Sequence, residues 1–190
     1  MLLPIYLVGY MGSGKTTAGR LLAEKLGWYF VDLDEAFKEI HGYSTAEYIR
    51  QFGLEEFRKK EKYVVEDLAD RIPFEKIIYA TGGGYPCWED NMECLLELGT
   101  SIYLRWKPEH LARRLSLTDL SERPVLQGRT EEELLAFITP QLAAREPYYA
   151  QANHILDVEI CDENSDERIA EELYEFIKGF SIPSRHCPSS

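Results

Sequence analysis

The segment from Gly9 to Thr16 carries the residues best suited to hold a nucleotide. It reads Gly-Tyr-Met-Gly-Ser-Gly-Lys-Thr and matches the phosphate-binding pattern G-x-x-x-x-G-K-[ST] at every specified position. Glycines let the backbone curl so that N–H groups face a phosphate, and a following helix adds its positive dipole end. Lys15 supplies a cation for the phosphates, and the Thr16 hydroxyl can ligate Mg²⁺. The pattern predicts binding of ATP with Mg²⁺; a glycine turn without a ligand is the alternative.

Asp32 and Asp34 stand two residues apart at the end of an expected strand. On an extended backbone, side chains at i and i+2 point to the same side. One carboxylate could hold Mg²⁺ through water, and the other could accept a hydrogen bond from an acceptor hydroxyl and act as its base. The alternative is that both carboxylates only cap the helix that follows.

A glycine triplet and two arginines are further candidates for an acceptor site. Gly82, Gly83 and Gly84 follow another expected strand, where a triplet suits either close backbone approach to a ligand or a flexible turn. Arg58 lies on a charge-rich helix whose solvated face could explain it. Arg145 precedes a proline at the expected end of a helix, where it could satisfy helix carbonyls. None of these residues is decisive alone.

The stretch 116–129 has no hydrophobic period and contains Arg123-Pro124 and Gly128. This composition favours a mobile lid over a packed element. Arg123 could then close onto the phosphates, where it would supply charge to the transition state and help to exclude water. A surface loop without a role is the alternative.

Strands and helices are expected to alternate along the chain and to position these residues. Hydrophobic patterns predict strands at 3–8, 29–32, 76–80, 101–104 and 154–158. Helices are expected at 15–26, 54–70, 89–98, 108–115, from Thr130 to about 144, and 165–178, with a further capping box formed by Ser44 and Glu47. The alternation predicts an α/β fold, a doubly wound five-stranded parallel sheet with ligands at the carboxyl ends of its strands.

Composition restricts the partners and the compartment. The 190 residues are expected to form one domain over 1–180, followed by a disordered tail at 181–190. A formal charge of −12 repels phosphate backbones, so neither nucleic acid nor an anionic membrane is an expected partner. The four cysteines show no metal-ligand spacing, and the N-terminal apolar run has no basic residue before it. We therefore expect a cytoplasmic protein with reduced thiols, and a monomer.

Over about 3–160, the motifs as a set resemble those of the shikimate kinase family. The resemblance lies in their order and approximate spacing: Gly9 to Thr17, Asp32-x-Asp34, Phe57-Arg58-x-x-Glu61, Gly82-Gly83-Gly84, Arg123-Pro124-x-Leu126 and Arg145-x-Pro147-x-Tyr149. It implies a P-loop kinase fold with a lid. It also implies ATP-dependent phosphorylation of the 3-hydroxyl of shikimate, a step towards chorismate and the aromatic amino acids.

The same resemblance implies roles for individual residues. Asp34 would receive the shikimate hydroxyls, Arg58 and Arg145 would grip its carboxylate, and Gly83 would present its backbone to the ring. Two guanidinium forks suit a carboxylate and would hold the hydroxyl in line with the γ-phosphate. The region 34–60 would bind substrate, and the full nucleotide set would be Gly12, Ser13, Gly14, Lys15, Thr16, Thr17, Arg113 and Arg123.

The resemblance also implies contacts with the metal ion and with the adenine. Asp32, with Thr16, would hold Mg²⁺, while Arg113 or its neighbour Arg114 would lie along the adenine. The segment 158–164 contains no Arg or Gln of the kind that the family often places near that base. Lys15, Asp34 and Arg123 remain the expected catalytic residues.

Other functions fit the P-loop alone. A gluconate kinase is disfavoured because a neutral polyol needs no arginine clamp, and a nucleoside monophosphate kinase would need a second base pocket. A non-enzymatic nucleotide-binding module would bind ATP without turnover. A degenerate chaperone-like regulator would lack Lys15 or Asp34, and both are present.

Overall fold

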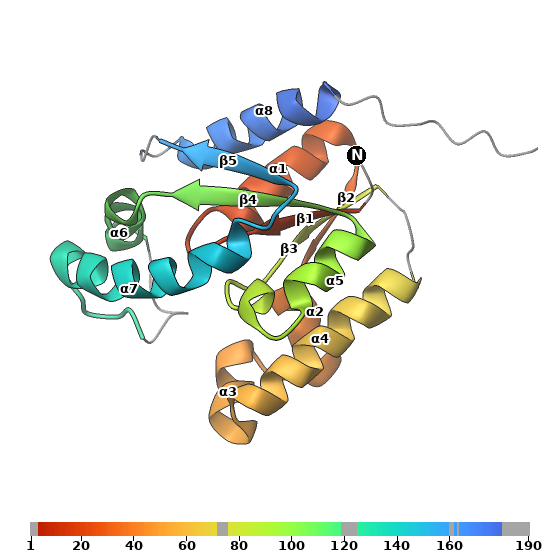
Figure 1. Cartoon of the computed structure of the whole chain (residues 1–190), viewed down its shortest axis with the longest axis horizontal. Coiled ribbons are helices and arrows are strands. Elements are labelled where there is room, and N and C mark those ends of the chain that lie inside the picture. Colours follow the sequence, from red (N-terminus) through yellow and green to blue (C-terminus); the bar gives the residue numbers. More distant parts are fainter. Residues whose placement is uncertain (1–3, 72–75, 119–124, 160–161, 163, 180–190) are drawn as a thin grey trace, which may run out of the picture.

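The computed structural model describes residues 4–71, 76–118, 125–159, 162 and 164–179. Its centre is a five-stranded parallel sheet in the order β2-β3-β1-β4-β5 (Figure 1). The strands are β1 Ile5–Val8, β2 Tyr29–Asp32, β3 Ile77–Ala80, β4 Thr100–Trp106 and β5 His154–Val158. The predicted doubly wound α/β fold is confirmed, because β1 lies between β3 and β4 and the strand order reverses there.

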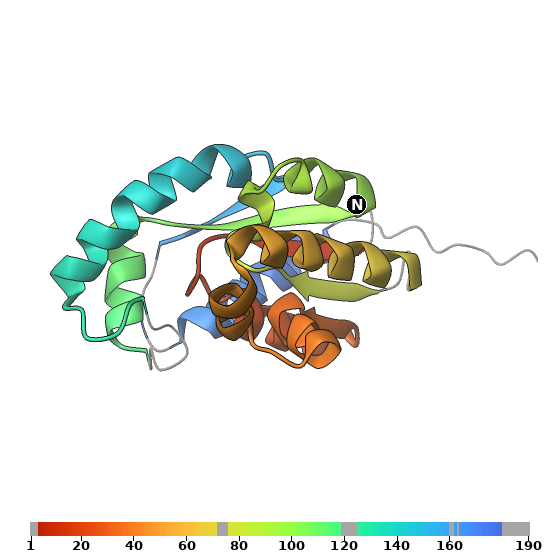
Figure 2. The ribbon, with the colours of Figure 1, turned by 90° about the horizontal axis from the view of Figure 1, so that it is seen from below.

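Helices connect the strands and cover both faces of the sheet. They are α1 Lys15–Leu26, α2 Leu33–His41, α3 Thr45–Phe52, α4 Leu54–Arg71, the 3₁₀ turn η1 Tyr85–Cys87, α5 Asn91–Leu98, α6 Pro108–Ser116, α7 Glu131–Tyr149 and α8 Ser165–Lys178. α1 and α8 pack together on one face, and α5 and α7 lie on the other (Figure 2). The four residues of β1 are all buried between these layers, as the apolar run predicts.

Two helices differ from the sequence-based expectation. α2 was not expected, and it begins directly after β2 because the Asp32 carboxylate accepts hydrogen bonds from the backbone N–H groups of Asp34 and Glu35. The prediction that Asp32 and Asp34 lie on an extended backbone is therefore wrong. Asp34 lies in the first turn of α2, and the helical turn brings the two carboxylates to the same cavity.

α7 extends past 144 to Tyr149, although Pro140 and Pro147 lie within it. A proline inside a helix costs about 3 kcal/mol. Each buried Leu or Ile contributes roughly 1.5–3 kcal/mol, so the buried face of the helix can offset that cost. The side chains that form this face are Leu134, Ile138, Leu142 and Tyr149. The longer helix matters for the site because it places Arg145 and Tyr149 one turn apart.

A small second core lies apart from the main one. Helices α2, α3 and α4 project together below the sheet in the view of Figure 1. Phe37, Tyr48, Phe57 and Val64 form a separate buried cluster between them. The capping box of Ser44 and Glu47 at the start of α3 is present as predicted.

Several sequence-based predictions fall outside the described residues, among them Arg123, the centre of the 116–129 lid and the tail at 181–190. Cys87 and Cys94 are free thiols. Within the described ranges, no helix has the length and apolar character required to cross a bilayer.

Candidate functional site

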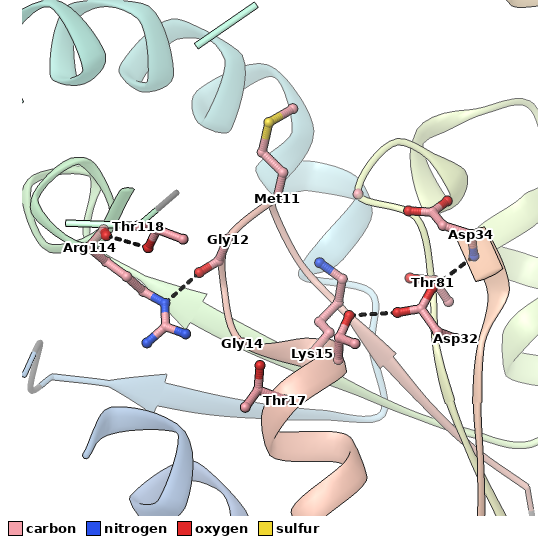
Figure 3. A pocket seen from close by; sticks show the side chains of 12 residues that line it. Met11, Gly12, Gly14, Lys15, Thr17, Asp32, Asp34, Thr81, Arg114 and Thr118 are labelled. Atoms are coloured by element: carbon pink, nitrogen blue, oxygen red, sulfur yellow. Dashed lines mark hydrogen bonds between the residues drawn. The ribbon is translucent and has the colours of Figure 1, made fainter. Parts of the chain in front are cut away.

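A cavity of about 210 Å³ surrounds the loop between β1 and α1 (Figure 3). We call it the P-loop cavity. Its lining residues come from the carboxyl ends of the strands and from α6: Met11, Gly12, Gly14, Lys15, Thr16, Thr17, Asp32, Asp34, Thr81, Gly83, Arg114 and Thr118. Because strand carboxyl ends and a helix amino end converge here, backbone N–H groups and the helix dipole favour an anion.

The conformation of the loop follows from its glycines and from Lys15. Gly14 precedes α1 with φ +92°, a left-handed conformation that residues with a Cβ rarely adopt. The Lys15 ammonium group is buried and donates hydrogen bonds to the carbonyl oxygens of Gly9 and Tyr10, both at 2.9 Å. The lysine thus holds the loop closed from within and lies beside the space that a phosphate would enter.

Thr16 and Asp32 lie together at the start of α1 and the end of β2. The Thr16 hydroxyl donates to Asp32 Oδ2 at 2.6 Å, and Asp32 Oδ1 caps α2 (Figure 3). Asp32 therefore does cap the helix that follows, as one part of the alternative held, while its second oxygen stays directed at the P-loop cavity. A hydroxyl next to a carboxylate matches the oxygen ligands that Mg²⁺ uses in phosphate-binding loops, where it keeps several waters.

A second cavity of about 560 Å³ opens between the P-loop and helices α2, α3, α4 and α7. We call it the arginine cavity because both predicted arginines line it. Its lining residues are Met11, Asp34, Glu35, Lys38, Ser44, Thr45, Ala46, Ile49, Phe57, Arg58, Glu61, Gly82, Gly83, Gly84, Val125 and Arg145. Met11, Asp34 and Gly83 line both cavities, so a ligand in one would lie next to a ligand in the other.

Side chains in place of the glycine triplet would meet neighbouring groups at all three positions. A Cβ at Gly84 would lie 2.0 Å from an Arg58 nitrogen, and a Cβ at Gly82 would lie 2.6 Å from Glu61 Oε1. At Gly83 it would lie 3.0 Å from the backbone nitrogen of Met11 in the P-loop. The triplet thus packs between the P-loop and the charged end of α4, and its middle residue, Gly83, forms part of the wall shared by the two cavities.

Arg145 reaches the same wall from α7. Its guanidinium group lies 5.0 Å from the ring centre of Tyr10, and Nη1 is 3.5 Å from the Gly83 carbonyl oxygen. The Tyr149 hydroxyl, one helical turn further on, also donates to that oxygen. Burial raises the pKa of the Tyr149 phenol, so it remains a neutral donor. The contacts of Arg145 and Tyr149 with Gly83 therefore hold α7 against the loop that separates the two cavities.

Arg58 is held by Glu61 on the next turn of α4. The Arg58 guanidinium group donates to the Glu61 carboxylate, whose side chain is only 4% exposed. Burial raises the pKa of Glu61 to about 7; Arg58 opposes that shift, and Asp34 adds to it. A carboxylate buried so deeply keeps the arginine directed towards the cavity.

The predicted residues therefore gather in two adjoining cavities, with three exceptions. Ser13 is buried beneath the loop and does not line the P-loop cavity. Arg113 lies on the exposed side of α6, whereas Arg114 lines the P-loop cavity and donates to the Gly12 carbonyl oxygen. Arg123 lies outside the described residues. Contacts of Ser13, Arg113 and Arg123 with a nucleotide remain predictions.

Among the residues without a role predicted from the sequence, three hold other parts of the site in place. Glu61 was part of a quoted motif, and its spacing of three residues from Arg58 on a helix is a recognisable ion-pair signal. Tyr149 could be placed only once α7 was known to continue through Pro147. Asp166, which pairs with Arg114, gave no recognisable signal in the sequence.

A parallel sheet of this order, a phosphate-binding loop after its central strand and an adjoining cavity lined by two arginines together define a P-loop kinase of small molecules. Comparison with known proteins gives the family. The shikimate kinase family model matches residues 11–178. The chain is 42% identical to a shikimate kinase from Parabacteroides distasonis over 155 residues, covering 82% of this chain and 87% of the relative. A shikimate kinase from Moorella thermoacetica is 38% identical and covers 93% and 95%.

Solved structures agree with this assignment. A shikimate kinase from Bacteroides thetaiotaomicron has a TM-score of 0.83 at 36% identity, covering 94% of this chain and 99% of that one. A shikimate kinase from Acinetobacter baumannii in complex with shikimate has a TM-score of 0.76 at 31% identity, covering 94% and 95%. The chain belongs to the shikimate kinase family, whose members are ATP-dependent phosphotransferases.

Proposed function

We propose that this chain transfers the γ-phosphoryl group of ATP to the 3-hydroxyl of shikimate. The observation that carries the proposal is the common wall of the two cavities, formed by Met11, Asp34 and Gly83. A triphosphate on the P-loop and an acid in the arginine cavity would meet at Asp34. Holding both reactants in one geometry supplies a large part of the catalysis of phosphoryl transfer.

The acceptor would be oriented by charge at one end and by hydrogen bonds at the other. Arg58 and Arg145 enter the arginine cavity from α4 and α7 and can bind a carboxylate with charge-assisted hydrogen bonds. Asp34 lies at the junction with the P-loop cavity, where it would accept the proton of the attacking hydroxyl or orient that hydroxyl. A neutral polyol would leave both guanidinium groups without a partner, which disfavours a gluconate kinase.

The donor would lie along the P-loop. Backbone N–H groups from Gly12 to Thr17 would receive the phosphates, and Lys15 would leave the loop carbonyls to follow the charge during transfer. Thr16 and Asp32 would hold Mg²⁺, which would neutralise charge between the β- and γ-phosphates. Among the described residues no cluster of three or more His, Cys, Asp or Glu could bind a metal, so Mg²⁺ here would depend on ATP and water for its other ligands.

An acceptor panel tests the proposal. A coupled assay with ATP and Mg²⁺ should give turnover with shikimate at least about 100-fold above that with gluconate, since only shikimate offers a carboxylate beside a ring hydroxyl near Asp34. Asp34→Asn should reduce kcat by about 100-fold or more while the KM for ATP stays near that of the parent. Glu39→Gln, which removes an exposed carboxylate from the same helix, is the control and should be fully active. Equal turnover with gluconate and shikimate would refute the proposal.

A further inference from the structure

Arg114 lies at the edge of the P-loop cavity and is held by contacts with three other parts of the molecule. Its Nε donates to the Gly12 carbonyl oxygen at 2.7 Å (Figure 3). Its Nη2 lies 2.7 and 2.8 Å from the two carboxylate oxygens of Asp166 on α8. Behind it, the Trp106 ring centre is 5.4 Å from the guanidinium carbon. One arginine thus joins the P-loop to β4 and to the C-terminal helix.

The Arg114–Asp166 pair is largely removed from solvent. Each of the two side chains is 18% exposed, far less than in the surface ion pair that Arg168 on α8 forms with Asp162, which precedes that helix, at 41% and 43%. A partly buried charge pair loses more than a surface pair when one partner is removed, because the other charge is left without compensation. The orientation of Arg114 therefore depends on Asp166 more strongly than surface pairs depend on their partners.

The Asp166 carboxylate lies directly against the phosphate-binding loop. A Cβ built on Gly14 would be 2.5 Å from Asp166 Oδ1 and 3.4 Å from the side chain of Ile169. Position 14 therefore favours glycine for two reasons: the backbone is left-handed, and the Asp166 carboxylate would contact any side chain there. Asp166 does not line the P-loop cavity, but a carboxylate packed against this loop would oppose phosphate binding there unless Arg114 neutralised its charge.

α8 holds Asp166 in place because the helix itself is packed against the rest of the protein. Its inner face buries Ile169, Ala170, Leu173 and Ile177, and it packs closely along α1. Trp106 contributes separately, because its indole N–H donates to the Ser13 carbonyl oxygen at 3.0 Å. The carbonyl side of the P-loop is therefore held by side chains from β4 and α6, and Asp166 supplies the link to α8.

We propose that Asp166 is a positioning residue for the donor nucleotide, acting through Arg114. It holds the guanidinium group at the edge of the P-loop cavity, and Arg114 in turn cancels the charge that Asp166 would otherwise place beside the phosphates. The inference rests on the proposed function, because it takes ATP as the ligand of that cavity. It makes the C-terminal helix part of the donor site.

A double-mutant cycle with kinetic and binding readouts tests this role. Asp166→Asn should raise the KM for ATP about fivefold, with the KM for shikimate within about twofold of the parent. Arg114→Ala should raise the KM for ATP about 30-fold, because the carboxylate beside Gly14 is then uncompensated. The double variant should bind ATP better than Arg114→Ala alone, at about 10-fold above the parent value, because that carboxylate is gone.

Glu167→Gln is the matched control, since Glu167 is an exposed acid in the same first turn of α8. Glu167→Gln should leave the KM values for ATP and shikimate unchanged. An effect seen only in Asp166→Asn would then come from the pair with Arg114 and not from loss of a negative charge at the start of α8. ADP affinity, measured by calorimetry without shikimate, should change in parallel with the KM for ATP. Parental turnover of shikimate tests the proposed function separately. If the parent is active but Asp166→Asn leaves the KM for ATP within twofold, the positioning role is refuted. It is also refuted if the rise in the KM for ATP in the double variant equals the product of the rises in the two single variants.

Discussion

The P-loop cavity and the arginine cavity adjoin, yet they are assembled in different ways. The phosphate-binding groups of the first come from one short segment, Gly12 to Thr17, whose backbone conformation is set by glycines and by a lysine bonded to its own loop. The charged groups of the second come from α2, α4 and α7, with the glycine triplet between them. The first is a local structure, and the second exists only when distant elements pack together.

The separate core of α2–α4 extends this contrast. Phe37, Tyr48 and Phe57 pack with one another rather than with the main core. Arg58 follows Phe57 directly, so one wall of the arginine cavity belongs to a region with its own hydrophobic cluster. We therefore expect changes in the P-loop cavity to affect the chemistry and the binding of the donor, and changes in the arginine cavity to affect the affinity for the acceptor.

The largest expected effect comes from Lys15→Met in the P-loop cavity. Loss of the cation that follows the transferred charge should reduce kcat by about 10³-fold or more, with an unchanged fold by circular dichroism. Lys25→Met removes a lysine from the exposed end of the same helix and is the control, which should be close to the parent. Substantial activity in the Lys15 variant would mean that the P-loop does not act on ATP.

Arg145→Ala should show the opposite pattern, because it changes the arginine cavity and leaves the P-loop cavity largely unaffected. Removing one of the two guanidinium groups should raise the KM for shikimate by about 10- to 100-fold and change the KM for ATP by less than about threefold. Arg105→Ala removes an arginine paired with Asp157 at the surface and should leave both constants near those of the parent. Steady-state kinetics with each substrate varied in turn would check this. An equal rise in the KM for shikimate and the KM for ATP would contradict the prediction that the two cavities bind their ligands separately.

The smallest expected effect is on the free energy of unfolding of the protein, which should depend on pH through Glu61 in the arginine cavity. The folded-state pKa of Glu61 is raised to about 7 from an ordinary 4.5, so the folded protein holds this proton more tightly than the unfolded chain. The free energy of unfolding should therefore be highest below about pH 4.5, as far as Glu61 contributes, and should fall as pH rises towards 7. Relative to Glu61→Gln, the parent should lose stability between pH 5 and pH 8.

Urea denaturation of both proteins at the two pH values measures this difference. Glu66→Gln, which removes an exposed carboxylate from the same helix, should show no comparable dependence on pH. A parent that gains stability over Glu61→Gln as pH rises would show that Arg58 outweighs burial in setting the pKa of Glu61.

The sequence determined the parts of this protein that depend on neighbours along the chain. The apolar run of β1, the glycines and lysine after it and the period of α1 are all local, so the P-loop could be placed to the residue. The alternation of strands and helices was sufficient for the parallel sheet, since connections between parallel strands are restricted. The same local patterns did not give the bounds of α2, although the capping alternative for Asp32 allowed for a helix after it.

Tertiary structure alone decided which distant side chains meet. Arg58 and Arg145 were each ambiguous in sequence, and their common cavity depends on packing between α4, α7 and the glycine triplet. α7 continues through Pro147 because burial outweighs local propensity, which no local pattern can weigh. Asp166 lies 52 residues from Arg114 in the chain, and only the packing of α8 against α1 brings its carboxylate to the P-loop.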